Sequence, residues 1–164
     1  MKSSVQASSS IGSDMPQAGE KAPEFELMND EGKRFRLADF KGRKVVLFFY
    51  PEDDTPTCTK QACLFRDGMD EISKRGAIVL GVSRDSVASH VKFKAKYKLN
   101  FPLLSDADLS TLQAYGVWKE KSMFGRKYMG TERTTFIIDE NGRIAKIFPK
   151  VRVKKHVQEV LAAL

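Results

Sequence analysis

The sequence predicts an α/β fold in which a mixed β-sheet carries helices on both faces. Apolar runs of strand length alternate with segments of helical periodicity, and a late pair of apolar runs is separated by a turn signal. Alternating strands and helices are typical of a parallel sheet covered on both sides, and a hairpin adds antiparallel strands. A chain of 164 residues suits one well-buried core, so we expect a single domain over residues 16–164.

The chain is expected to begin with a tail and a β-hairpin. The N-terminus is rich in Ser, Ala and Gly and lacks the apolar block of a secretory signal, so residues 1–15 are predicted to be a disordered tail. Asn29-Asp30-Glu31-Gly32 is a turn signal between Phe25–Met28 and Lys33–Arg36, and it predicts a hairpin. A turn of helix over Leu37–Gly42 should follow.

The centre of the chain is predicted to be a buried strand followed by a long helix. Lys44–Tyr50 holds a continuous apolar run, as a buried strand does. After it, apolar residues recur at spacings of four and three and draw a stripe down one face of a helix that should end near Gly76. The stripe consists of Cys58, Ala62, Phe65, Met69 and Ile72.

The remainder continues the alternation and closes with a second hairpin and a helix. Asp139-Glu140-Asn141-Gly142 is the turn signal of that hairpin. The expected elements are strands over Ala77–Val82 and Phe101–Leu104, helices over Ser86–Tyr97, Leu109–Tyr115 and Lys154–Leu164, and strands over Thr134–Ile138 and Arg143–Phe148.

Composition argues against nucleic-acid and membrane partners. The net charge is +7, but lysines and arginines are scattered, with one denser run over Lys150–Lys155. No aromatic interleaving or nucleic-acid-binding signature accompanies that run, so solvated surface charge that steers acidic partners is the favoured interpretation. The longest apolar run, Val45–Tyr50, falls far short of the roughly 20 residues that a bilayer requires. Cytoplasm is the expected location.

The two cysteines of the chain, Cys58 and Cys63, lie where the central strand leads into the helix. Cys58 would occupy the first helical turn, where unpaired backbone N–H groups and the helix dipole stabilise an anion. Because cysteine reacts as its thiolate, Cys58 is a candidate nucleophile. The acidic residues Glu52, Asp53 and Asp54 would oppose a thiolate if they lay close to it, so a cation is needed from elsewhere.

The motif around Cys58 resembles that of the peroxiredoxins, in particular the peroxiredoxin Q or bacterioferritin-comigratory-protein subfamily. Their P-x-x-x-T-x-x-C motif matches Pro51, Thr55 and Cys58, and the subfamily's second cysteine, five residues on, matches Cys63. The similarity continues through VLGVSRD, FPLLSD, YGVW and KSMFGRKYMGTERTTFIID, so it covers almost the whole chain after the tail. Thr57 stands where many relatives carry Gly.

This resemblance implies a thioredoxin-like fold and a thiol peroxidase that needs no cofactor. Cys58 would attack hydrogen peroxide or an organic hydroperoxide and become a sulfenic acid. Thr55 would help to bind the peroxide, Pro51 would shield the sulfur from water, and the family's arginine falls on Arg133. A guanidinium stays charged and has several donors, so Arg133 would supply the missing cation.

The resemblance also gives Cys63 a role, as the residue that resolves the sulfenic acid into a disulfide with Cys58 in the same chain. Five helical positions rotate the second side chain roughly 140° and shift it about 7.5 Å along the axis. A disulfide needs Cα atoms within about 7 Å and converging side chains. We therefore hypothesise that the first helical turns unwind before the bond forms, and Gly68 and Thr59 would make the helix marginal. Thioredoxin or a similar dithiol is the expected reductant, and a monomer the expected state.

Each site residue also has a purely structural interpretation. Cys58 could be a buried packing residue, and Cys63 could be incidental or a structural partner. Thr55 could only cap the helix, and Arg133 could form a surface ion pair with Glu132 or another nearby acid. The aromatic residues Trp118, Phe124 and Tyr128 are expected to be core or pocket-wall residues. Two distant histidines and a C-x₄-C spacing do not indicate a metal site, so no metal is predicted.

Two other functions compete with the peroxidase. A thioredoxin-like thiol-disulfide oxidoreductase without peroxidase turnover would use two cysteines, but it favours C-x-x-C spacing, whereas four residues separate the two cysteines here. A non-enzymatic binding module on the same fold is the other, because a fold alone does not fix a function.

Overall fold

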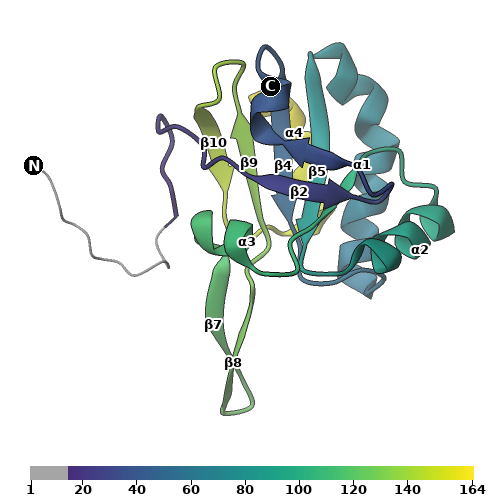
Figure 1. The fold of residues 1–164 in the computed structure, drawn as a ribbon, viewed down its shortest axis with the longest axis vertical. Helices are drawn as coiled ribbons and strands as arrows, with labels where there is room; N and C mark the ends of the chain where they lie inside the picture. The colour runs from purple at the N-terminus through teal and green to yellow at the C-terminus, as the bar shows by residue number, and fades with distance from the viewer. Residues whose placement is uncertain (1–14) are drawn as a thin grey trace, which may run out of the picture.

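The computed structural model describes residues 15–164, so residues 1–14, which make up most of the predicted tail, lie outside the described part. A seven-stranded sheet with the order β10-β9-β4-β5-β6-β2-β3 forms the centre, and β7 and β8 form a separate hairpin (Figure 1). The strands of the large sheet are β2 (Glu26–Asn29), β3 (Arg34–Arg36), β4 (Lys44–Phe49), β5 (Ala77–Ser83), β6 (Leu103–Ser105), β9 (Thr134–Ile138) and β10 (Ile144–Phe148). The predicted mixed sheet and N-terminal hairpin are confirmed.

Strand β4 occupies the middle of the sheet. It pairs in parallel with β5 on one side and antiparallel with β9 on the other. Its residues 45–49 are at most 1% exposed, which explains why the strand is a continuous apolar run instead of an alternating one. The carboxyl end of β4 and the amino end of β9 therefore meet at the same edge, where Phe49 pairs with Thr134.

Helices cover both faces of the sheet, as predicted. Because side chains alternate along a strand, Val46 and Phe48 of β4 face one core cluster and Val45 and Leu47 face the other. The first cluster is completed by α1 (Pro56–Lys74), α2 (Val87–Tyr97) and α4 (His156–Ala163), and the second by the 3-10 helix η2 (Leu37–Phe40) and α3 (Ser110–Ala114). A short 3-10 turn, η3 (Val153–Lys155), leads into α4. Within residues 15–164, no helix has the length and apolar content to cross a bilayer.

Gly68 marks the place where α4 packs closely on α1. A Cβ atom at this position would lie 2.9 Å from Cγ1 of Val157, which is closer than real side chains approach each other. The glycine therefore has a packing reason, although the sequence suggested only that it weakens the helix. It lies beyond Cys63, so the contact with α4 holds the part of α1 that follows both cysteines.

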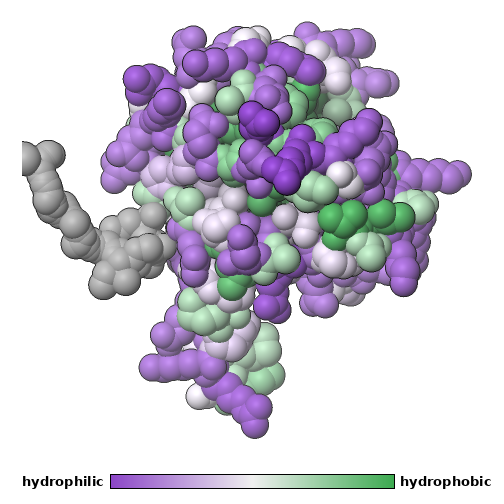
Figure 2. All heavy atoms as spheres, viewed as in Figure 1, coloured by the Kyte–Doolittle hydropathy of each residue, from purple (hydrophilic) through white to green (hydrophobic). Residues whose placement is uncertain are grey.

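The hairpin of β7 (Trp118–Met123) and β8 (Arg126–Thr131) was not predicted. Its strands are mostly exposed, so they lack the apolar alternation that identifies a strand, and it projects from the rest of the fold (Figures 1 and 2). Phe124 and Gly125 form its two-residue turn with φ of 52° and 77°, the left-handed values that such turns require. Phe124 is not a core residue, because it is 98% exposed at the tip, but it lines an open pocket there together with Tyr128.

His156, the first residue of α4, is buried against α1 and β9. Its Nε2 atom lies 2.8 Å from the hydroxyl of Thr135, and its ring contacts that of Phe65 edge-on. Its Nδ1 atom is 3.6 Å from Glu159, too far for a hydrogen bond. Burial lowers the pKa of His156 from its ordinary value of 6.5, although Glu159 acts in the opposite direction. The folded protein therefore favours the neutral ring.

This environment predicts a loss of stability in acid that a His156→Gln variant should lack. The unfolded chain binds a proton near pH 6.5, while the folded chain resists it until lower pH. Stability from the neutral ring is thus present above pH 6.5 and declines as pH falls below it, by at most about 1.4 kcal/mol per pH unit. Urea unfolding between pH 7.5 and 5 should show a steeper decline in the parent protein than in the variant. Parallel curves would contradict the prediction.

Candidate active site

Cys58 lies at the start of α1, directly after the loop that leaves the central strand. It is the third residue of the helix and 2% exposed. Helix geometry leaves the N–H groups of Thr57 and Cys58 without an intrahelical acceptor, so the sulfur sits among donors and near the positive end of the helix dipole. The predicted position of Cys58 in the first turn is confirmed.

Arg133 joins the start of β9 to this helical turn. One guanidinium nitrogen, Nη2, lies 3.3 Å from the sulfur of Cys58. The other, Nη1, donates a hydrogen bond of 2.6 Å to Oε1 of Gln61. The alternative of a surface ion pair with Glu132 does not hold, because Glu132 pairs with Lys119 at 2.9 Å. The fork of Arg133 therefore spans two residues on the same face of α1.

Gln61 is the residue of this site that the sequence analysis missed. It is 1% exposed and follows Cys58 by three positions, so it continues the buried stripe of the helix. The sequence does hold a signal for it, because a glutamine three positions after Cys58 falls on the buried face of the helix, where a polar group needs a partner. Its Nε2 atom has no partner among the described residues, while its carbonyl oxygen holds Arg133.

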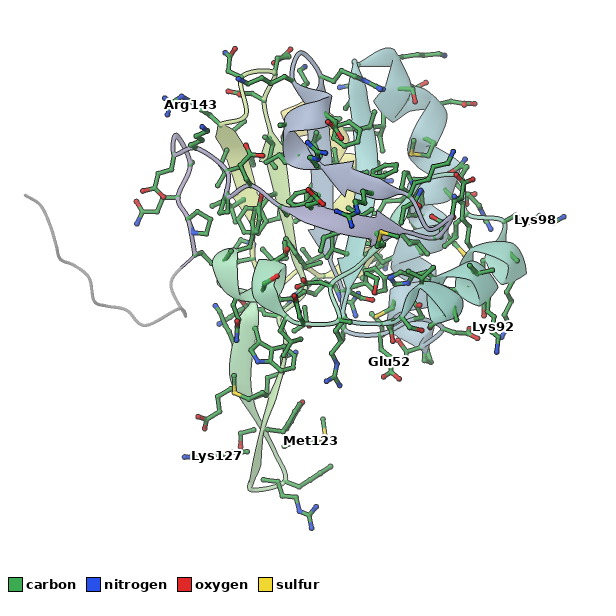
Figure 3. The ribbon with its side chains drawn as sticks, in the orientation of Figure 1. Glu52, Lys92, Lys98, Met123, Lys127 and Arg143 are labelled. Atoms are coloured by element: carbon green, nitrogen blue, oxygen red, sulfur yellow. The ribbon has the colours of Figure 1, made fainter. Side chains whose placement is uncertain are left out.

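The acidic residues before the helix are engaged away from the sulfur. Glu52 points outward from the edge of the molecule (Figure 3). Asp53 binds His90 at 2.7 Å, and Asp54 binds Lys96 at 2.8 Å, both on α2. Side chains of α2, in addition to Arg133, therefore compensate the negative charges of Asp53 and Asp54.

Thr55 and Pro51 lie in the loop between β4 and α1, both half-buried. Thr55 has the extended backbone of an N-cap residue, but its side chain makes no capping bond. Its hydroxyl donates instead to the carbonyl of Glu52 at 3.1 Å, which leaves its oxygen free to accept a hydrogen bond. The interpretation of Thr55 as a side-chain cap is therefore wrong.

Cys63 lies one turn and a half further along the same unbroken helix. Both cysteines are free thiols, Cys58 buried and Cys63 half-buried. Because α1 runs without interruption from Pro56 to Lys74, the helix separates the two side chains as the spacing predicted. The structure brings Cys58, Gln61 and Arg133 together, and it keeps Cys63 apart from them.

Lys121 adds a further positive charge near the guanidinium of Arg133. Lys121 of β7 donates a hydrogen bond of 2.6 Å to the carbonyl of Thr131. Burial lowers the pKa of Lys121, Glu132 raises it, and the charge of Arg133 lowers it further. Lys121, on the projecting hairpin, thus adds positive charge to the surroundings of Arg133 and Cys58.

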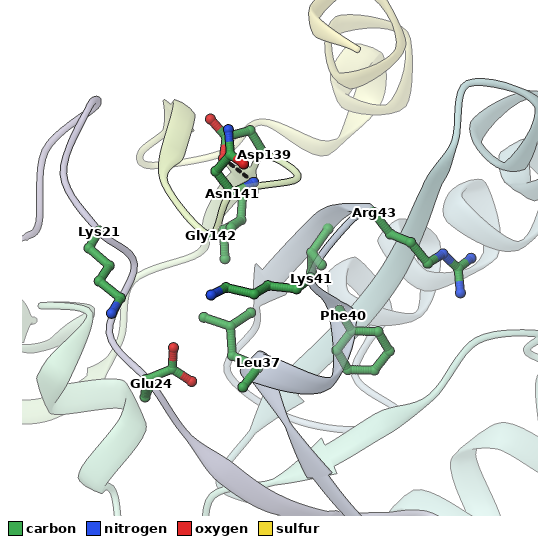
Figure 4. A pocket seen from close by; sticks show the side chains of 12 residues that line it. Lys21, Glu24, Leu37, Phe40, Lys41, Arg43, Asp139, Asn141 and Gly142 are labelled. Carbon is green, nitrogen blue, oxygen red and sulfur yellow. Dashed lines mark hydrogen bonds between the residues drawn. The ribbon is translucent and has the colours of Figure 1, made fainter.

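A pocket at the other end of the sheet is separate from the cysteines. It is lined by side chains around the start of β4 and the end of β9, among them Lys21, Lys41 and Asp139 (Figure 4). Cys58 follows the opposite end of β4, so this pocket does not belong to the candidate site. Among residues 15–164, no three His, Cys, Asp or Glu side chains are grouped to hold a metal ion.

Comparisons with known proteins agree on one family. Residues 18–147 match the model of the AhpC/TSA family. The chain is similar to peroxiredoxin Bcp of Bacillus subtilis, with 49% identity over 146 residues that cover 89% of this chain and 93% of that protein. It is also similar to peroxiredoxin Bcp of Escherichia coli strain K12, with 44% identity over 144 residues, 88% of this chain and 92% of that protein.

A solved structure shares the fold. The bacterioferritin comigratory protein of Xanthomonas campestris, whose structures were used to study its alkyl peroxide reduction activity, aligns with a TM-score of 0.84 and 39% identity. The alignment covers 90% of this chain and 96% of that one. The fold is therefore the thioredoxin-like α/β fold of these proteins, as the resemblance implied.

The two bonds of Arg133 predict that Arg133→Lys slows the reaction of Cys58 with thiol reagents. An ammonium is a single point charge and does not hold sulfur and amide together as the fork does. Loss of one charge-assisted hydrogen bond, about 1.5–3 kcal/mol, corresponds to a slowdown of about tenfold or more. Iodoacetamide alkylation followed by mass spectrometry in a Cys63→Ser background measures this rate. Arg143→Lys, at an exposed arginine that binds the carbonyl of Gly19, is the matched control, and equal rates in both variants would contradict the prediction.

Proposed function

This chain belongs to the AhpC/TSA family, in the Bcp or peroxiredoxin Q group of thiol peroxidases, and from that premise we propose that Cys58 is its peroxidatic cysteine. The contact of 3.3 Å between Arg133 and the sulfur of Cys58 carries the proposal. The substrates would be hydrogen peroxide and alkyl hydroperoxides, since the related Xanthomonas campestris protein is described by its alkyl peroxide reduction. Family membership sets aside the alternative of a disulfide oxidoreductase without peroxidase turnover.

In the first step the thiolate of Cys58 attacks the nearer oxygen of the peroxide. A sulfur–oxygen bond forms and the oxygen–oxygen bond breaks, so sulfur loses two electrons and becomes a sulfenic acid. The leaving oxygen takes a proton and departs as water or as an alcohol. The site must hold the peroxide in line with the sulfur and stabilise the charge that grows on the leaving oxygen.

The surroundings of Cys58 suit both tasks. Arg133, fixed by Gln61, directs its guanidinium donors at the sulfur, where they would also reach a bound peroxide. The hydroxyl oxygen of Thr55 would accept a hydrogen bond from the O–H group of the peroxide, because its own O–H donates to the Glu52 carbonyl. The free N–H groups of the first helical turn add further donors. Pro51, half-buried in the same loop, would limit the access of water.

In the second step Cys63 would resolve the sulfenic acid. Its sulfur attacks that of Cys58, a disulfide forms, and the hydroxyl leaves as water. Since α1 is unbroken between the two cysteines, its first turns must unwind for the sulfurs to meet. No side chain caps the start of α1, but Arg133 binds it to β9, and Cys58 and Ala62 pack in the core, so unwinding must break these contacts. Thioredoxin or a similar dithiol would then reduce the disulfide, and the protein would act as a monomer.

The two steps predict different behaviour for the two cysteine variants. Cys58→Ser should abolish peroxide consumption, because no other thiolate has the support of Arg133. Cys63→Ser should consume one equivalent of peroxide to form the sulfenic acid, and one more for each further oxidation of that sulfur, but it should not turn over because the resolving thiol is missing. Intact mass after peroxide treatment and NADPH consumption in a thioredoxin system measure the two outcomes.

The parent protein is the control for both variants. It should lose two hydrogens on treatment with one equivalent of peroxide and turn over repeatedly with thioredoxin. Thioredoxin-dependent turnover of Cys63→Ser at the parent rate would show that Cys63 does not resolve the sulfenic acid. Peroxide consumption by Cys58→Ser at the parent rate would contradict the whole proposal.

A further inference from the structure

Asp53 is a buried carboxylate in the loop that carries Pro51 and Thr55. Its side chain is 4% exposed, which is rare for a carboxylate unless it has partners. Three polar groups lie at 2.7 Å from its oxygens: the hydroxyls of Tyr50 and Ser89, which donate to it, and Nδ1 of His90, which shares a proton with it. The last two belong to α2, so the loop is joined to a helix that lies 30 or more positions away in sequence.

His90 contacts Asp53 through one ring nitrogen and β6 through the other. It is fully buried, and its Nε2 atom lies 3.1 Å from the carbonyl oxygen of Leu104 in β6. A carbonyl only accepts hydrogen bonds, so Nε2 must carry a proton. One more proton then lies between Nδ1 and Asp53, which makes the pair neutral overall whichever atom holds it. Every ring nitrogen and carboxylate oxygen of the pair is satisfied, as buried polar groups require.

Other groups of the same loop also bind residues distant in sequence. The N–H group of Asp53 donates to Asp85 at 2.9 Å. Asp54 has a left-handed backbone with φ of 56° and binds both Lys96 and the hydroxyl of Tyr97 at 2.8 Å. Two adjacent carboxylates therefore bind both halves of α2. Asp53, Asp54 and Lys92 line one shallow pocket, and Figure 3 shows Glu52 and Lys92 along the same edge.

We propose that Asp53, Tyr50, Ser89 and His90, which we name the loop clamp, are positioning residues for peroxide reduction at Cys58. The clamp fixes the backbone between Pro51 and Thr55, and through it the direction of the Thr55 hydroxyl. An active-site group displaced by about 1 Å costs on the order of a hundredfold in rate, so such a restraint matters to the chemistry.

The position of the clamp separates it from the second half of the catalytic cycle. None of its four members lies in residues 56–65, the part of α1 that would unwind before Cys63 reacts. The clamp therefore holds while the helix unwinds, and the loop returns to one place when the helix reforms. The clamp should influence the oxidation of Cys58 and leave reduction of the disulfide unchanged.

Two substitutions at Asp53 test this inference, which rests on the proposed function of Cys58. Asp53→Ala removes the clamp and leaves no buried charge behind, and it should slow the second-order oxidation of Cys58 by hydrogen peroxide about 10- to 100-fold. Asp53→Asn keeps three hydrogen bonds, because its Nδ2 group can donate to a neutral His90 and to the Ser89 oxygen while its Oδ1 atom still accepts from Tyr50, and it should stay within about threefold of the parent rate. Stopped-flow competition measures oxidation, and a dithiothreitol chase of the preformed disulfide should give equal rates in all proteins.

Asp106→Asn is the matched control. Asp106 is also a buried carboxylate, 1% exposed, but it accepts hydrogen bonds from the amides of Thr111 and Leu112 in α3. This variant should lower the melting temperature and leave the oxidation rate unchanged. If Asp53→Ala does not fold, His90→Gln replaces it, because glutamine keeps one donor toward Asp53, and a slowdown of several-fold is expected.

The outcomes separate the clamp from the peroxidase itself. Parent-like oxidation of folded Asp53→Ala, or of His90→Gln in its place, would overturn the positioning role. An equal slowdown of Asp53→Ala and Asp53→Asn would also overturn it, because the variant that keeps the hydrogen bonds of the loop would then be no better than the variant that removes them. If Cys58 of the parent does not react with peroxide, the proposed function fails, and this result is distinct from a failure of the clamp alone.

Discussion

The contact between Arg133 and the first turn of α1 is the interaction on which the site depends. A thiolate in a buried position needs a compensating charge, and the helix terminus alone supplies only partial charges. Arg133 brings a full charge to within 3.3 Å of the sulfur, and Gln61 holds the guanidinium in that place. Without this bond the buried sulfur would keep only the partial charges of the helix terminus.

The sheet topology makes that contact possible. Cys58 and Arg133 are separated by 75 positions in the sequence, yet they follow and precede adjacent strands. Because β9 runs antiparallel to β4, its first residue lies beside the last residue of β4. If β9 ran parallel to β4, its carboxyl end would lie beside Phe49. Arg133, which precedes the strand, would then lie at the opposite end of the sheet.

The sequence alone predicted most of the fold but only part of the site. The strands and helices followed from apolar periodicity, and Pro51, Thr55, Cys58, Cys63 and Arg133 followed from a motif and a family resemblance. The partners of Asp53 on α2 depend on how two distant segments pack, and no local pattern records that. The β7–β8 hairpin was not predicted because its exposed strands bury little apolar surface and therefore show no apolar periodicity.

The two halves of α1 are held by different contacts, the first by Arg133 and core packing and the second by α4 and α2. Beyond Cys63, Gly68 lets α4 pack against the helix, and Arg66 donates to the carbonyl of Tyr97 at 2.6 Å. If the first two or three turns unwind as proposed, these contacts would confine the change to that part of the helix, and one small patch of surface would change shape while the rest of the molecule keeps its form. An electron donor that recognises this patch would discriminate between the two redox states, and would dock on molecules that await reduction in preference to those that are ready for peroxide.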